Sequence, residues 1–62
     1  MPHELSKDDI ARSAAGMIRA YGNDAKRESA ARAKKFTARG APEAARNWSA
    51  IVLAIVELRA KT

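Results

Sequence analysis

The chain has 62 residues and a formal net charge of +5, with no cysteine and a single histidine. A chain of this length forms one domain, residues 1–62, near the lower limit for burying its own core. The missing cysteines exclude disulfides, and one histidine excludes a histidine-rich metal site. No apolar run approaches the about 20 residues that span a bilayer. The N-terminal residues also lack the pattern of a secretion signal, so we expect a cytoplasmic protein.

The composition favours an all-α fold, because alanine is abundant while glycine is limited to three residues and proline to two. Two breaks divide the chain, Gly22-Asn23 and Gly40-Ala41-Pro42. We therefore predict a small three-helix domain with helices over about 7–21, 24–39 and 42–60. Residues 1–5 are expected to form a frayed N-terminus.

The helix over 7–21 has a clear beginning and one apolar face. Ser6 is a good N-cap, and Leu5 and Ile10 occupy the positions of a hydrophobic staple. The apolar face is expected to contain Ile10, Ala14, Met17, Ile18 and Tyr21. Gly22 supplies a left-handed C-terminal position, and Asn23 is expected to cap the next helix.

The helix over 24–39 is expected to bury mainly small side chains. Its predicted inner face is Ala25, Ser29, Ala33 and Phe36, with Ala30 and Thr37 at the margin. Small residues allow helix backbones to approach closely, so this helix should pack tightly against its neighbours.

The helix over 42–60 carries more apolar surface than its two neighbouring helices, which have few large apolar side chains, would cover. Pro42 suits its first turn. Its main stripe is Ala44, Trp48, Ile51, Ile55 and Leu58, widened by Ala45, Val52 and Val56, with Leu53 further round. We predict a homodimer, or a complex with another protein, in which the contact residues are Trp48, Ile51, Val52, Leu53, Ile55 and Val56. The alternative is a monomer in which this helix is central and a few apolar side chains are exposed.

The basic residues of the second helix support an alternative function. A small nucleic-acid-associated protein would use Arg27, Arg32, Lys34, Lys35 and Arg39 as phosphate contacts. Two observations weigh against it. Bases near helix ends and acids near helix starts also suit the helix dipole. The first turn of this helix carries the acidic Asp24, which would repel phosphates.

The sequence shows no catalytic constellation. Asp8 and Asp9 fit first-turn dipole charges better than a catalytic pair, and no nucleophile is matched with a base. A domain this small also has little room for a substrate pocket. We therefore expect no enzyme activity, no cofactor, no metal and no small-molecule substrate. The predicted function is a helical protein-interaction or regulatory module that self-associates through the helix over 42–60.

The chain also resembles a known group of proteins over about residues 10–58. The matching residues are Met17-Ile18-x-x-Tyr21-Gly22-x-Asp24-Ala25, Arg32-Ala33, Gly40 and Trp48-x-x-Ile51-x-x-Ala54-Ile55-x-x-Leu58. This pattern is similar to that of short uncharacterised three-helix proteins of alphaproteobacterial type, a domain of unknown function. The resemblance implies a helical fold and no activity. The present chain is more basic in its second helix than that pattern.

Overall fold

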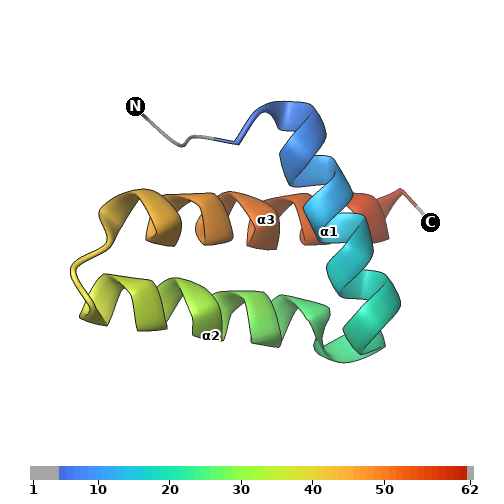
Figure 1. Ribbon diagram of the computed structural model, residues 1–62. Helices are drawn as coiled ribbons and strands as arrows, with labels where there is room; N and C mark the ends of the chain where they lie inside the picture. The colour runs from blue at the N-terminus through green and yellow to red at the C-terminus, as the bar shows by residue number, and fades with distance from the viewer. Residues whose placement is uncertain (1–4, 62) are drawn as a thin grey trace.

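The computed structural model describes residues 5–61 and is helical throughout, with short connections (Figure 1). It contains α1 (Lys7–Tyr21), the 3-10 turn η1 (Gly22–Asp24), α2 (Ala25–Ala38) and α3 (Pro42–Ala60). No strand occurs in the described part of the chain, so the all-α prediction is confirmed. The predicted bounds of α1 and α3 match, whereas α2 is shorter than predicted by one residue at each end.

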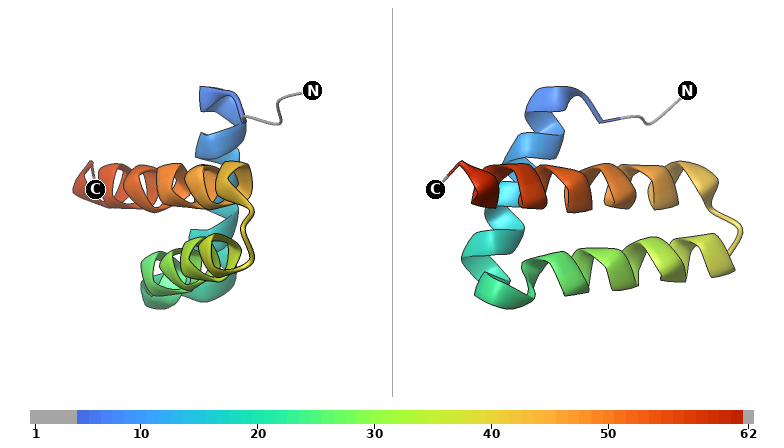
Figure 2. Two further views of the ribbon diagram at one scale, coloured as in Figure 1. Left: turned by 90° about the vertical axis from the view of Figure 1, so that its left-hand side faces the viewer. Right: turned by 180° about the vertical axis from the view of Figure 1, so that it is seen from behind.

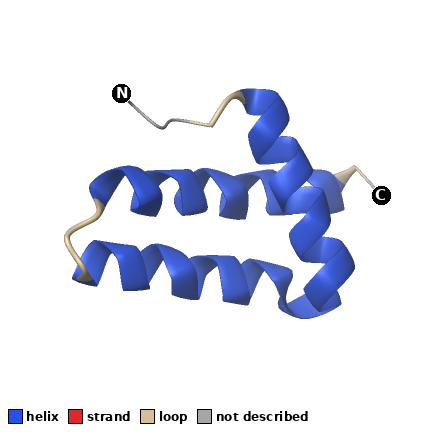
Figure 3. Cartoon of the chain, viewed as in Figure 1, coloured by secondary structure: helices blue, strands red, loops and turns tan. Residues whose placement is uncertain are grey.

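The number of separate helices differs from the prediction. Helical structure continues without interruption from α1 through η1 into α2, so residues 5–61 contain two unbroken helical stretches rather than three (Figure 3). The physical reason is the 3-10 turn, in which the backbone N–H of Ala25 donates to the carbonyl of Gly22. The predicted cap at Asn23 is wrong, because Asn23 lies inside this turn and no side chain caps α2.

The ends of α1 follow the predicted signals. The Oγ of Ser6 accepts a hydrogen bond of 3.1 Å from the backbone N–H of Asp9. Gly22 has φ +57° and donates its N–H to the carbonyl of Ile18. The frayed segment was predicted to extend to Leu5, and residues 1–4 lie outside the described chain. Leu5 itself is half-buried and donates its backbone N–H to Asn47 Oδ1.

The helices α2 and α3 form an antiparallel hairpin, and α1 crosses one face of it (Figure 1). The views of Figure 2 agree: seen from behind, α3 passes in front of α1. The hairpin is connected by a short turn in which Gly40 has φ +75°. In the opposite corner of the molecule, Arg59 donates through Nη2 to the carbonyl of Gly22, so the end of α3 is bonded to the α1–α2 corner.

The core lies where α1 crosses the hairpin. The buried cluster consists of Ala14, Met17, Ala25, Ile51 and Ile55. Half-buried side chains surround it: Leu5, Ile10, Ile18, Trp48, Ala54 and Leu58. Full burial of one isoleucine contributes roughly 1.5–3 kcal/mol, so α3 supplies much of the stabilisation. As predicted, α2 adds small buried residues, Ala25 and Ser29. None of the helices within residues 5–61 has the length and apolar character needed to cross a membrane.

Candidate protein-interaction surface

The apolar side chains of α3 divide into a buried side and an exposed side. Ile51 and Ile55 are 2% and 0% exposed, and both belong to the core. Leu53 and Val56, in contrast, are 66% and 42% exposed. Residues two apart on a helix lie about 200° apart round its axis, so Leu53 must point away from the side that holds Ile51 and Ile55. Within the described residues, Leu53 is the most exposed of the large apolar side chains.

Leu53 forms one wall of an apolar groove between α2 and α3. The groove encloses about 400 Å³ and is lined by Ala30, Ala33, Lys34, Ser49, Val52 and Leu53. Most of these side chains are small or apolar, and Lys34 is the single charged residue among them. Two of the three residues that α2 contributes, Ala30 and Ala33, have small side chains, whereas Leu53 of α3 is large.

A second groove lies on the other side of Leu53, between α1 and α3. It encloses about 410 Å³ and is lined by Lys7, Ile10, Ala11, Ala50, Leu53, Ala54 and Glu57. Here the charged residues are Lys7 and Glu57, which carry opposite signs. Leu53 therefore lines both grooves, and the charged residues among the others that line them are Lys7, Lys34 and Glu57. We call Leu53 together with these two grooves the Leu53 surface.

Only part of the predicted contact set belongs to this surface. Leu53 and Val52 line the α2–α3 groove, and Val56 is exposed on α3. Ile51 and Ile55 are buried in the core, and Trp48 is half-buried against it. Sequence reasoning missed the alanines of α2 and Ser49, because a small side chain gives no sign of whether it lies beneath a neighbour or beside an open groove.

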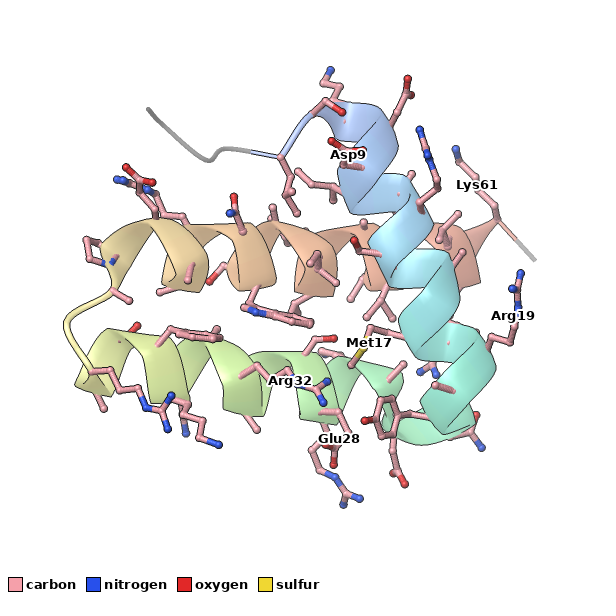
Figure 4. All side chains as sticks on the ribbon, in the orientation of Figure 1. Asp9, Met17, Arg19, Glu28, Arg32 and Lys61 are labelled. Atoms are coloured by element: carbon pink, nitrogen blue, oxygen red, sulfur yellow. The ribbon has the colours of Figure 1, made fainter. Side chains whose placement is uncertain are left out.

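Arg32 holds together residues from all three helices. Its Nη2 donates to Tyr21 Oη at 3.1 Å, and its Nη1 lies 3.4 Å from Met17 Sδ. The guanidinium carbon is 5.4 Å from the ring centroid of Tyr21 and 5.1 Å from that of Trp48. Both distances fit cation–π contacts. Figure 4 shows Arg32 of α2 beside Met17 of α1, on the face that α1 crosses.

The five predicted phosphate contacts have different surroundings in the described chain. Arg32 is engaged by Tyr21 and Trp48 as described, and Arg27 forms an ion pair with Asp24 at 3.0 Å. Lys34 is one of the residues that line the α2–α3 groove. Lys35 and Arg39 are exposed further round the helix and beyond its end.

The remaining hollows of the described chain do not suggest a catalytic site. Two shallow grooves lie near the α2–α3 turn, one beside Arg46 and Thr37 and the other beside Glu43 and Asn47. Neither is lined by a nucleophile with a matching base. Within residues 5–61, no three histidine, cysteine or carboxylate side chains gather as a metal site would need.

Comparison of the chain with protein-family models, curated proteins and solved structures found no match. The resemblance to alphaproteobacterial three-helix proteins therefore stays a prediction.

Proposed function

We propose that this chain is a small, non-enzymatic, cytoplasmic interaction module that binds a second copy of itself through the Leu53 surface. The observation that carries the proposal is the 66% exposure of Leu53 between two grooves of apolar character. Burying this side chain would contribute roughly 1.5–3 kcal/mol for each copy. We also propose kinship with the alphaproteobacterial proteins named above.

A second copy suits this surface because a protruding side chain and a groove lie on the same face. A two-fold interface is made by one patch contacting its own copy, so it needs both features on one surface. Leu53 supplies the protrusion, and the small side chains of Ala30 and Ala33 supply the groove beside it.

The nucleic-acid alternative has weaker support. Phosphate binding requires several cations that are free to reach one strand. Two of the five predicted cations, Arg27 and Arg32, already have partners within the chain. A protein interface centred on Leu53 would account for the exposure of this side chain, whereas phosphate binding would not.

The proposal is tested by the variant Leu53→Glu, with sedimentation equilibrium as the measurement. The native chain should be dimeric at micromolar concentration, and the variant should dissociate with a Kd weaker by about a hundredfold or more. The helix content of the variant, measured by circular dichroism, should stay unchanged because Leu53 lies outside the core.

The matched control is Ala31→Glu, which places the same charge on an exposed position of α2. This variant should dimerise like the native chain. A native chain that sediments as a monomer over the whole concentration range would refute self-association. Ile55→Glu is unsuitable as a test, since Ile55 is fully buried and its replacement would unfold the domain.

A further inference from the structure

We draw no further inference here: the strongest candidate, the exposed apolar face of α3 around Leu53 and Val56, carries nothing beyond the self-association already proposed, because nothing in the structure shows what covers it.

Discussion

At the scale of single residues, two polar side chains of α2 have roles that differ from their usual ones. Arg32 contacts Tyr21 and Trp48 and thereby connects three helices, although arginine on a basic helix suggests a solvent-exposed charge. Ser29 is 0% exposed, and its Oγ has no hydrogen-bond partner. A buried hydroxyl without a partner loses its hydration and gains nothing in return. Ser29 therefore lowers the stability of the fold that it helps to pack.

Replacing Ser29 with alanine should raise the free energy of unfolding by about 1 kcal/mol or more, because the desolvation cost disappears while the packed Cβ is kept. Urea denaturation followed by circular dichroism measures this change. Ser13→Ala, at a half-buried position of α1, is the control for the gain in helix propensity alone. If Ser29→Ala gains no more than Ser13→Ala, the hydroxyl of Ser29 has a partner in solution.

At the scale of helices, the corner between α1 and α2 depends on the backbone of one residue. Gly22 has φ +57° and ψ −124°, a conformation that residues with a Cβ rarely adopt. Its carbonyl accepts hydrogen bonds from Ala25 and from Arg59, so the corner is bonded both to α2 and to the end of α3. Gly22 therefore joins the end of α1 both to α2 and to the end of α3.

Gly22→Ala and Gly16→Ala should change stability in opposite directions. No atom would contact an added Cβ at either position, so the backbone alone decides the effect. Gly22→Ala should cost about 1–3 kcal/mol through strain. Gly16 lies inside α1, where alanine should gain about 1 kcal/mol.

Thermal unfolding measures both variants, since 1 kcal/mol shifts the Tm of a domain this size by about 4–8 °C. A Gly22→Ala variant as stable as the native chain would show that the corner adopts another conformation in solution.

At the scale of the whole molecule, the charge and the apolar surface favour different partners. The net charge of +5 would attract an acidic polymer and repel a second copy. The Leu53 surface favours a second copy, since most of the residues that line its α2–α3 groove are small or apolar. These two kinds of association respond to salt with opposite signs.

Added salt should therefore strengthen self-association, because it screens the repulsion between two copies that each carry +5. Sedimentation equilibrium across a series of sodium chloride concentrations measures the effect. Binding to DNA or RNA would instead weaken steeply as salt rises, since it depends on counterion release. A dimer that dissociates with added salt would mean that charge pairs, and not Leu53, hold it together.

Much of the secondary structure could be predicted from local signals. Ser6, Gly22 and Pro42 fix helix ends through hydrogen bonds and backbone angles that involve near neighbours in the chain. Both bounds of α1 and the start of α3 followed from them. The 3-10 turn was missed because the dipeptide Gly22-Asn23 is compatible both with a break between two helices and with a tighter helical turn that joins them.

The candidate site was predicted less well, for a physical reason that Leu53 and Ile55 illustrate. Both are apolar residues of one helix, and periodicity shows that they point to different sides. Which side is covered depends on where α1 and α2 pack, and those positions are set by contacts between residues distant in the chain. The sequence by itself determined the helical segments and the excess of apolar surface on α3. Only the tertiary structure decided that Ile55 is core, that Arg32 is held by Tyr21 and Trp48, and that Leu53 stays exposed.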